Sequence, residues 1–369
     1  MFVKPVGASC NLACNYCYYL DKTKLLAESG IHRMTDELLE MYIIQHIQAS
    51  STQPIFFSWH GGEPTLAGLY YFHRIVEIQK KHLPHNRSVL NGFQTNGTLL
   101  DDEWCRFLKK ENFIVGISLD GPERFHVANR FRKDGKSSFD EVLRGFQLLK
   151  SHQIPCEILC VVHAQNVRYP QEVYRFFKSL KAEFLTFIPL VERFSPDILS
   201  DRTVPAKAFG EFLCAIFDEW KTEDIGTLKI QIFEEALRTA FGLDHSHCIF
   251  KRTCGRVPVV EHNGDFYPCD HFVDSSHLGG NLRNNPLAEL LESQEQKSFG
   301  QAKLNTLPVF CQQCEFLNMC NGACPNDRFI ETPDGKPGLN YLCEGYKLFF
   351  NHCNPFIEEV ARVWKLQQS

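Results

Sequence analysis

The sequence predicts an α/β protein in which parallel strands alternate with helices, followed by a region held together by metal. Three observations support this prediction. Six short apolar runs are separated by segments of helical periodicity, a pattern typical of parallel β-α units. The helical periodicity fades after about Leu243, where Gly, Asn, Pro and Cys become frequent. Most of the 16 cysteines fall within the first 17 residues or beyond residue 247.

The scaffold elements follow from the apolar pattern. The predicted strands are at residues 2–6, 55–59, 89–94, 113–119, 156–162 and 184–189. A helix is expected after the candidate cap Ser137, because apolar residues from Phe139 to Leu149 recur on one helical face. Another helix is expected after Pro205, where an aromatic stripe extends to Trp220. Both stripes are expected to be core, since burying them drives packing onto the sheet.

The composition argues against two classes of partner. Lys and Arg number 39 against 44 Asp and Glu, a net charge of −5, which leaves no positive surplus for a nucleic acid backbone. No apolar run approaches the roughly 20 residues that cross a bilayer, and the first residues lack the apolar core of a signal peptide. We therefore expect a cytoplasmic protein without a nucleic acid or membrane partner. In a reducing compartment, 16 cysteines indicate metal ligation or redox chemistry rather than disulfides.

The first cysteine set, Cys10, Cys14 and Cys17, directly follows the first predicted strand. Three soft ligands in one loop suit an iron–sulfur cluster or a zinc ion. The CxxxCxxC spacing, with Tyr16 before the last cysteine, resembles the signature of the radical S-adenosylmethionine (radical SAM) enzymes. The resemblance implies that these cysteines hold a 4Fe-4S cluster whose fourth iron binds SAM, and that one electron cleaves SAM to a 5'-deoxyadenosyl radical. It also places Tyr16 near the adenine.

Polar and glycine-rich motifs end the following predicted strands, where β-α architectures bind ligands. They are Gly61-Gly62-Glu63-Pro64, Gln94-Thr95-Asn96-Gly97 and Ser118-Leu119-Asp120-Gly121. Paired glycines permit a close backbone approach to a ligand, and free carbonyls there can accept from an ammonium group. The motifs resemble the SAM pocket of the family, which implies that Gly61, Gly62 and Glu63 lie against the SAM amino group. It implies that Gln94, Ser118 and Arg130 contact the ribose and the carboxylate, with Arg132 a close alternative to Arg130.

The second cysteine set comprises Cys248, Cys254, Cys269, Cys311, Cys314, Cys320, Cys324 and Cys343. Zinc knuckles are one interpretation of such spacing. The arrangement also resembles the SPASM extension of some radical SAM enzymes, which binds two auxiliary 4Fe-4S clusters. The resemblance implies a first auxiliary cluster on Cys248, Cys254, Cys269 and Cys324, and a second on Cys311, Cys314, Cys320 and Cys343. The remaining cysteines, Cys105, Cys156, Cys160, Cys214 and Cys353, are expected to be core residues.

These resemblances refine the predicted fold. It is a partial (β/α)6 radical SAM barrel over residues 1–241, followed by a SPASM region with two auxiliary clusters over 242–346. A C-terminal helix is expected within 347–369, from about Pro355. Three 4Fe-4S clusters and SAM are the implied cofactors.

Within the SPASM group the chain resembles the anaerobic sulfatase-maturating enzymes over nearly its whole length. The segments that carry this resemblance are 17–19 (CYY), 61–68 (GGEPTLAG), 94–98 (QTNGT), 158–162 (ILCVV) and 267–270 (YPCD). It implies oxidation of Cys or Ser in an unfolded sulfatase segment, Cys/Ser-x-Pro/Ala-x-Arg, to Cα-formylglycine. A one-electron reductant such as flavodoxin or ferredoxin is the implied second partner.

Oxidation of a CH2-OH or CH2-SH group to an aldehyde removes two electrons, and hydrogen-atom abstraction removes one of them. The auxiliary clusters are candidates for accepting the second electron, and a carboxylate near the substrate heteroatom would take the proton. Asp270 follows Cys269 and matches the base position of the family, with His271 a lesser candidate. His60 stands where many sulfatase maturases have Gln, and the loop 191–204 is a candidate for the substrate entrance.

Other functions are compatible with the cysteine pattern. One is a SPASM-type maturase that crosslinks or otherwise modifies another ribosomal peptide. Another is an iron–sulfur electron carrier, which needs neither an open cluster site nor a SAM pocket. A third is a zinc-stabilised interaction module. Iron and sulfide analysis distinguishes zinc from clusters, and SAM cleavage distinguishes a catalyst from a carrier.

Overall fold

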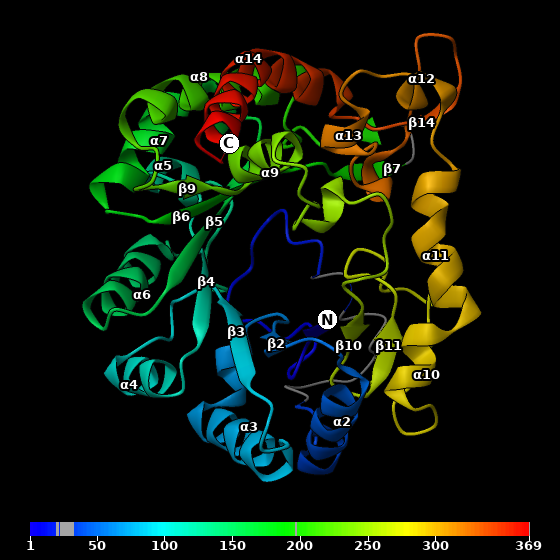
Figure 1. Ribbon diagram of the computed structural model, residues 1–369. Coiled ribbons are helices and arrows are strands. Elements are labelled where there is room, and N and C mark those ends of the chain that lie inside the picture. Colours follow the sequence, from blue (N-terminus) through cyan, green and yellow to red (C-terminus); the bar gives the residue numbers. More distant parts are fainter. Residues whose placement is uncertain (20–21, 23–32, 196–197, 369) are drawn as a thin grey trace. The chain divides into compact units, whose positions relative to one another are not determined.

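The computed structural model describes residues 1–19, 22, 33–195 and 198–368 (Figure 1). The chain forms two compact units that alternate along the sequence. The first unit comprises Met1–Leu119, Val127–Glu157 and Gly255–Gly300. The second comprises Asp120–His126, Ile158–Cys254 and Gln301–Ser369. The three sequence-based segments, 1–241, 242–346 and 347–369, do not coincide with these units and stay a prediction.

The first unit contains a parallel sheet formed by β1 (Phe2–Val3), β2 (Ile55–Trp59), β3 (Val89–Thr95) and β4 (Ile114–Ser118). The register pairs Val3 with Trp59 and Trp59 with Phe93. The helices after the strands are α2 (Asp36–Ala49), α3 (Leu69–His82), α4 (Asp102–Lys110) and α6 (Phe139–Ser151), with the short η1 (Pro64–Ala67). These strands confirm the apolar runs predicted from the sequence, although the first is shorter than expected.

Helix α4 illustrates how the sequence specifies these elements. Asp101 caps it by accepting a hydrogen bond from the backbone N–H of Trp104 at 2.9 Å. Acidic residues lie in its first turn and basic residues in its last, as the helix dipole favours. Its buried Trp104 packs against Phe72 of α3 and Phe93 of β3, with ring centroids 5.3 and 5.6 Å apart. Truncating Trp104 to Ala would cost about 3–5 kcal/mol of stability.

The sheet of the first unit continues into the cysteine-rich region through strands that were not predicted from the sequence. They are β10 (Val259–Val260), β11 (Asp265–Tyr267) and β12 (Gly280–Asn281), followed by α10 (Leu287–Glu292). Strand β10 is parallel to β1, pairing Phe2 with Val259, while β11 and β12 are antiparallel. Strands of two or three residues are too short to show an alternating pattern, so periodicity cannot reveal them. Their pairing brings the segment after β11 into the same unit as the first cysteine loop.

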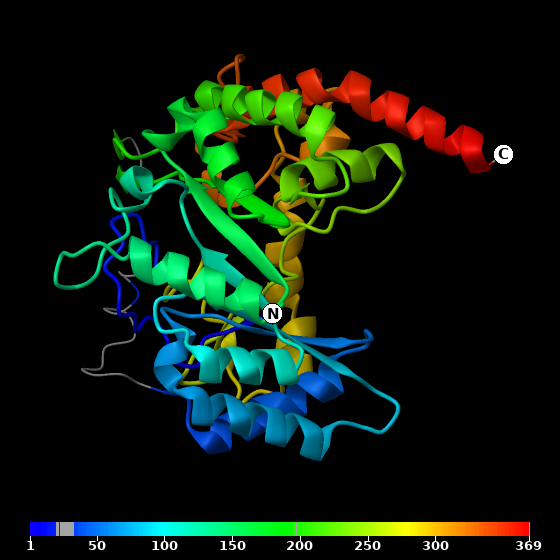
Figure 2. The same cartoon turned by 90° about the vertical axis from the view of Figure 1, so that its left-hand side faces the viewer.

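The second unit contains strands β5 (Cys156–Val162), β6 (Phe184–Pro189) and β9 (Lys229–Ile230) in that order, β5 beginning at the end of the first unit. Its main helices are α7 (Pro170–Ser179), α8 (Ala206–Glu223), α9 (Gln231–Ala240) and α14 (Cys343–Gln368). The predicted stripe of α8 is buried as expected, and its Phe217 packs against Phe349 of α14, with centroids 5.9 Å apart. Figure 2 shows α14 alongside α8, with its C-terminal half extending past it.

The C-terminal helix begins at Cys343 rather than near Pro355, which lies inside it. The residues before the proline, Phe349, Phe350 and Cys353, are buried, and Ile357 and Ala361 after it are buried too, so packing stabilises the helix on both sides of Pro355. Gly345 allows the close approach to α8, because a Cβ there would lie 2.1 Å from the carbonyl oxygen of Ala206.

Apart from α11, which has 12 residues, the remaining elements are short. The helices are α5 (Glu123–His126), α11 (Gln294–Asn305), α12 (Val309–Gln312), α13 (Leu317–Cys320), η2 (Asn166–Arg168), η3 (Cys248–Phe250) and η4 (Pro325–Asp327). The hairpins are β7 (Arg193–Ser195) with β8 (Ile198–Leu199), and β13 (Ile330–Glu331) with β14 (Pro337–Leu339). The first hairpin lies in the loop 191–204, whose residues 196–197 are outside the described part.

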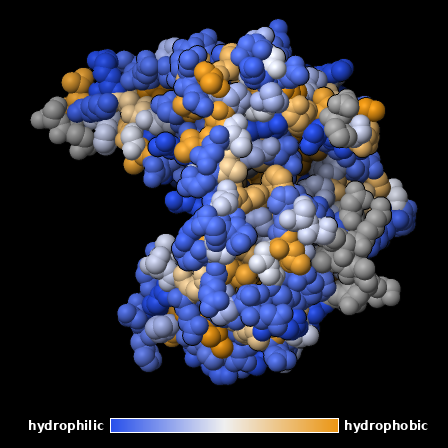
Figure 3. Space-filling model, turned by 90° about the vertical axis from the view of Figure 1, so that its right-hand side faces the viewer, coloured by the Kyte–Doolittle hydropathy of each residue, from blue (hydrophilic) through white to orange (hydrophobic). Residues whose placement is uncertain are grey.

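One face of the molecule is mainly hydrophilic. Figure 3 shows a face on which hydrophilic residues predominate and apolar ones are scattered in small groups. None of the helices in the described ranges has both the length and the apolar character needed to cross a membrane.

Candidate active site

The first cysteine loop follows β1 in the first unit. It is held by backbone pairing with the segment around Arg130: the N–H of Ala13 donates to the Phe131 carbonyl at 2.8 Å. The N–H of Asn15 donates to the Asn129 carbonyl at 2.9 Å. These two hydrogen bonds fix the shape of the loop. Without them the loop would be flexible and would not hold its three cysteines in fixed positions.

The thiol of Cys10 is partly buried and accepts hydrogen bonds from two donors. Burial, followed by the charges of Glu63 and Cys17, raises its pKa to about 11. The backbone N–H of Leu12 donates to its Sγ at 3.4 Å and the Asn96 amide at 3.7 Å. A thiolate there needs a cationic partner such as the iron of a cluster, and the two donors stabilise sulfur that carries negative charge.

The glycines of the 61–64 motif allow the loop after β2 to lie directly against the first cysteine loop. The N–H of Gly62 donates to the Gly7 carbonyl at 2.8 Å, and the N–H of Glu63 donates to the Ser9 carbonyl at 2.8 Å. A Cβ on Gly62 would lie 2.0 Å from the Ser9 oxygen, so only glycine fits. The close approach inferred from Gly61 and Gly62 is therefore, in the structure, an approach to the chain's own cysteine loop.

Glu63 is fully buried and connects two motifs. Its carboxylate accepts hydrogen bonds from the hydroxyls of Thr65 and Thr95, each at 2.7 Å, and from the backbone N–H of Asn96 at 2.7 Å. Burial raises its pKa, and these donors oppose the rise. The structure thus uses Glu63 to fasten the motif after β2 to the end of β3, and its contact with SAM stays a prediction.

The other predicted SAM contacts come together in pairs. The side-chain amide of Gln94 donates to the Ser118 hydroxyl at 3.3 Å, which joins the ends of β3 and β4. The guanidinium of Arg130 lies over the Tyr16 ring, 5.4 Å from its centroid. Arg132 instead pairs with Glu141 at 2.8 Å. Arg130 therefore lies beside Tyr16 of the first cysteine loop, whereas Arg132 is paired with a carboxylate, and contact of either with SAM stays a prediction.

Asp270 lies in a buried cluster of charged and aromatic side chains in the first unit. Its carboxylate forms an ion pair with Lys4, which is 2% exposed, and accepts a hydrogen bond from Tyr18, the residue that follows Cys17. Burial favours the neutral carboxyl, but Lys4 and Tyr18 outweigh it and lower the pKa of Asp270 to about 2. Asp270 is therefore ionised at neutral pH and lies beside the first cysteine loop.

The partners of Asp270 were missed by the sequence analysis. The Lys4 ammonium also lies over the Tyr19 ring, 3.1 Å from its centroid, and Tyr19 donates a hydrogen bond to the buried Glu261. The detectable signal was Lys4 itself, a lysine at the end of an apolar strand, since lysine is rarely buried without a partner. His271 stacks on Tyr18, with ring centroids 5.3 Å apart, and its role as the lesser candidate base stays a prediction.

His60 lies at the edge of this cluster. Its ring stacks on Phe2 at 3.9 Å, and its backbone N–H donates to the Val3 carbonyl at 2.7 Å. Burial lowers its pKa to about 3, so the imidazole is neutral. A neutral imidazole carries one N–H donor and one ring-nitrogen acceptor.

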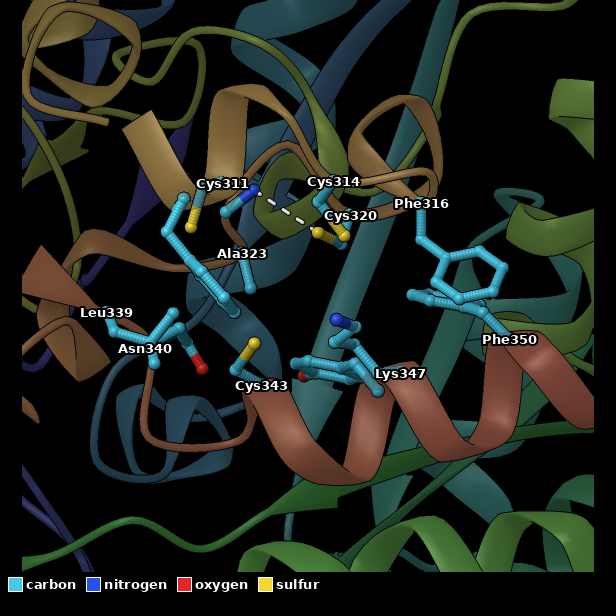
Figure 4. Close-up of a pocket in the computed structure, with 13 residues that line it drawn as sticks. Cys311, Cys314, Phe316, Cys320, Ala323, Leu339, Asn340, Cys343, Lys347 and Phe350 are labelled. Atoms are coloured by element: carbon cyan, nitrogen blue, oxygen red, sulfur yellow. Dashed lines mark hydrogen bonds between the residues drawn. The ribbon is translucent and has the colours of Figure 1, made fainter. Parts of the chain in front are cut away.

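Four cysteines of the second set surround one cavity in the second unit. Figure 4 shows them on different elements: Cys311 on α12, Cys314 in the turn after it, Cys320 at the end of α13 and Cys343 at the start of α14. The cavity walls are otherwise mostly apolar, formed by Phe310, Phe316, Leu339, Tyr346 and Phe350 among others. Burial raises the pKa of Cys320 to about 11 and that of Cys343 to about 12.

The other predicted set is brought together only in part within one unit. The thiols of Cys248, Cys254 and Cys324 all interact electrostatically with the buried Lys303 of the second unit. Burial lowers the pKa of Lys303 to about 8. The fourth expected ligand, Cys269, belongs to the first unit, where it lies near Tyr18.

These donor sets fit iron–sulfur clusters. Four thiols facing one apolar cavity match the four-cysteine ligation of a 4Fe-4S cluster, and water exclusion suits a redox centre. Three thiols in the first loop would leave one iron of such a cluster for another ligand. No disulfide joins any of the cysteines in the described ranges. In that same part of the chain, no three His, Cys, Asp or Glu side chains are placed to hold a single metal ion.

Comparison with known families agrees with this geometry. The sequence model of the radical SAM superfamily matches residues 5–177. The sequence model of the SPASM iron-sulfur cluster-binding domain matches residues 252–315. A serine-type anaerobic sulfatase-maturating enzyme of Bacteroides thetaiotaomicron is 42% identical over 100% of this chain and 92% of its own. A cysteine-type enzyme of Clostridium perfringens is 34% identical over 98% of each chain.

Solved structures show the same relationship. One described as native anSMEcpe with bound AdoMet and Cp18Cys peptide has a TM-score of 0.88 and 32% identity, covering 98% of each chain. The SuiB structure from Streptococcus suis bound to S-adenosylmethionine, at 14% identity and a TM-score of 0.63 over 93% of this chain and 76% of its own, shares the fold alone. The predicted fold class, a radical SAM domain with a SPASM domain, is confirmed.

Proposed function

The chain belongs to the anaerobic sulfatase-maturating enzymes, and we propose on that basis that it oxidises a Ser or Cys side chain in a sulfatase segment to Cα-formylglycine. The observation that carries the proposal is the position of Asp270. Its carboxylate accepts a hydrogen bond from Tyr18, the residue that follows the SAM-cluster ligand Cys17. A proton acceptor thus lies next to the loop where the radical would be generated.

The cysteines hold the cofactors in this proposal. Cys10, Cys14 and Cys17 bind the cluster that coordinates SAM. The two auxiliary clusters use Cys248, Cys254, Cys269 and Cys324, and Cys311, Cys314, Cys320 and Cys343. When bound, SAM and its cluster would supply the hydrogen-atom acceptor, and the auxiliary clusters would supply an acceptor for the second electron.

SAM is positioned by four side chains, those of Tyr16, Gln94, Ser118 and Arg130. The Arg130 guanidinium lies over the Tyr16 ring, so both side chains are held before the cofactor arrives. Gln94 and Ser118 are hydrogen-bonded to each other at the ends of adjacent strands. Gly61 and Gly62 allow the neighbouring loop to approach, and Glu63 holds it against β3.

Asp270 takes the proton of the substrate hydroxyl or thiol. An ionised carboxylate with a low pKa is a weak base toward an alcohol. Once the carbon has lost a hydrogen atom and an electron, however, the remaining O–H or S–H proton is far more acidic, so a weak base suffices. Lys4 and Tyr18 keep the carboxylate ionised and oriented in the buried site.

The substrate is an extended sulfatase peptide of the form Cys/Ser-x-Pro/Ala-x-Arg. Serine is favoured as the oxidised residue by one serine-type relative, that of Bacteroides thetaiotaomicron, which is 42% identical against 34% for the cysteine-type relative of Clostridium perfringens. Flavodoxin or ferredoxin would supply the electron that cleaves SAM, in the cytoplasm.

The test compares Asp270→Asn with the parent enzyme under anaerobic conditions. Asp270→Asn keeps the size of the side chain, so it is expected to bind all clusters and form 5'-deoxyadenosine while losing most of the formylglycine. Mass spectrometry of the peptide and chromatography of the nucleoside measure both products. An unchanged formylglycine yield would overturn the role of Asp270.

A further inference from the structure

Two cations lie among the cysteines of the second unit without a carboxylate partner. Lys303 is 1% exposed, and its ammonium donates to the carbonyls of Ile249 at 2.7 Å and Cys248 at 3.3 Å. The half-buried Arg328 donates to the carbonyls of Gly322, Asn321 and Lys303 at 2.8, 2.9 and 2.6 Å. Within the described part of the chain, neither cation forms an ion pair with Asp or Glu.

A buried ammonium surrounded by carbonyls alone is an expensive arrangement. Removing the charge from water costs several kcal/mol, and a neutral donor could satisfy the same carbonyls at a lower cost. Negative charge in this region comes from the thiols of Cys254, Cys324 and Cys248, which interact with Lys303 and become thiolates when a cluster binds. The ammonium is therefore placed to compensate the negative charge of a thiolate-ligated cluster.

We propose that Lys303 raises the reduction potential of the auxiliary cluster held by Cys248, Cys254 and Cys324, which favours this cluster as the acceptor of the substrate electron. The proposal rests on the proposed function. In that reaction the substrate loses one hydrogen atom to the deoxyadenosyl radical, one electron to an oxidised auxiliary cluster and one proton to Asp270. Reduction adds one negative charge beside the Lys303 ammonium, and a nearby cation stabilises the reduced form.

Arg328 provides an internal comparison. Its guanidinium interacts with Cys254 and Cys324 of one set and with Cys311 and Cys320 of the other. Removing its charge is therefore expected to affect both auxiliary clusters. Lys303 interacts mainly with Cys248, Cys254 and Cys324, which belong to one of the two auxiliary ligand sets. Removing the charge of Lys303 is therefore expected to affect chiefly one cluster.

The experiment is a redox titration followed by electron paramagnetic resonance on the full chain. Cys10, Cys14 and Cys17 are replaced by Ala in the background, so that only the auxiliary clusters contribute signals. In Lys303→Met the ratio of reduced to oxidised cluster at the parent midpoint is expected to fall about tenfold for one of the two couples. This equals a potential about 59 mV lower for a one-electron couple.

Two controls accompany the neutral variant. Lys303→Arg retains the charge and is expected to restore the parent potential. Arg252 is exposed and lies two residues before Cys254, so its charge is screened by water and Arg252→Met is expected to change neither couple. Both couples unchanged in a fully loaded Lys303→Met, or an equal change in Arg252→Met, would overturn the proposal.

A second neutral variant is included in case Lys303→Met fails to bind its auxiliary clusters. Lys303→Gln keeps a donor for the backbone carbonyls, and the same lowering of one couple is expected. If neither neutral variant holds the cluster and Lys303→Arg does so with the parent potential, Lys303 has a purely structural role and the proposal fails. The potentials are measured without peptide, so absence of formylglycine formation by the parent enzyme would refute the proposed function separately.

Discussion

Lys4→Met tests the buried charge cluster around Asp270. In the parent enzyme Lys4 and Tyr18 lower the pKa of Asp270 to about 2 although burial raises it. An opposite charge in contact lowers a carboxyl pKa by about 1–3, worth about 1.4–4 kcal/mol. Without Lys4 the pKa is expected to rise by about 1–3, from about 2 to between about 3 and 5, because burial is no longer opposed by the ammonium. At the upper end of this range Asp270 would become protonated as the pH falls toward about 5, and could then no longer accept the substrate proton.

The assay measures formylglycine per 5'-deoxyadenosine between about pH 4.5 and 8, a range that reaches the upper part of the expected titration. The parent enzyme is expected to give a constant ratio, since its carboxylate stays ionised throughout. In Lys4→Met the ratio should fall as the pH is lowered, while 5'-deoxyadenosine formation continues. Lys4→Arg should restore the constant ratio, and removal of Lys136, whose side chain is 77% exposed, should have no effect. A constant ratio in a Lys4→Met enzyme that carries all of its clusters would refute the role of Lys4 in keeping Asp270 ionised.

Three further predictions test other parts of the account. Cys14→Ala should abolish 5'-deoxyadenosine formation but retain the iron of the auxiliary clusters; continued SAM cleavage would contradict its role as ligand. Gly345→Ala should lower the free energy of unfolding by about 1–3 kcal/mol, because its Cβ would lie 2.1 Å from the Ala206 oxygen; an unchanged melting temperature would contradict the close helix contact. Burial lowers the pKa of His46 to about 4, so the stability it provides is complete above its unfolded value of about 6.5 and is lost as the pH falls toward 4. His46→Phe should therefore reduce the loss of stability between about pH 7 and 5 by about 2 kcal/mol in denaturant unfolding, and an equally steep loss in the variant would count against this.

The scaffold could be predicted because each element has a local signal. The strands at Ile55–Trp59, Cys156–Val162 and Phe184–Pro189 match the predicted runs at both ends, since buried parallel strands are continuous apolar segments. The aromatic stripe of α8 was also predicted correctly, because a helix buries residues at a fixed period.

The surroundings of the site could not be predicted in the same way. Strand β10 has only two residues, so nothing local indicates that it pairs with β1 and extends the sheet beside Lys4. The ion pair of Lys4 with Asp270 joins residues far apart in the sequence of the first unit, and such contacts depend on strand order. The cysteines could be grouped only through family resemblance, and the structure now places four of them, including Cys311 and Cys343, around one cavity.

The most direct test of the central claim is anaerobic mass spectrometry of two matched peptides, Ser-x-Pro-x-Arg and Cys-x-Pro-x-Arg. The reconstituted enzyme is incubated with each peptide, SAM and a strong one-electron reductant. We expect formylglycine together with an equal amount of 5'-deoxyadenosine, with the serine peptide oxidised at least as fast as the cysteine peptide. Formation of 5'-deoxyadenosine with no change in the mass of either peptide would contradict the account and indicate a different peptide substrate.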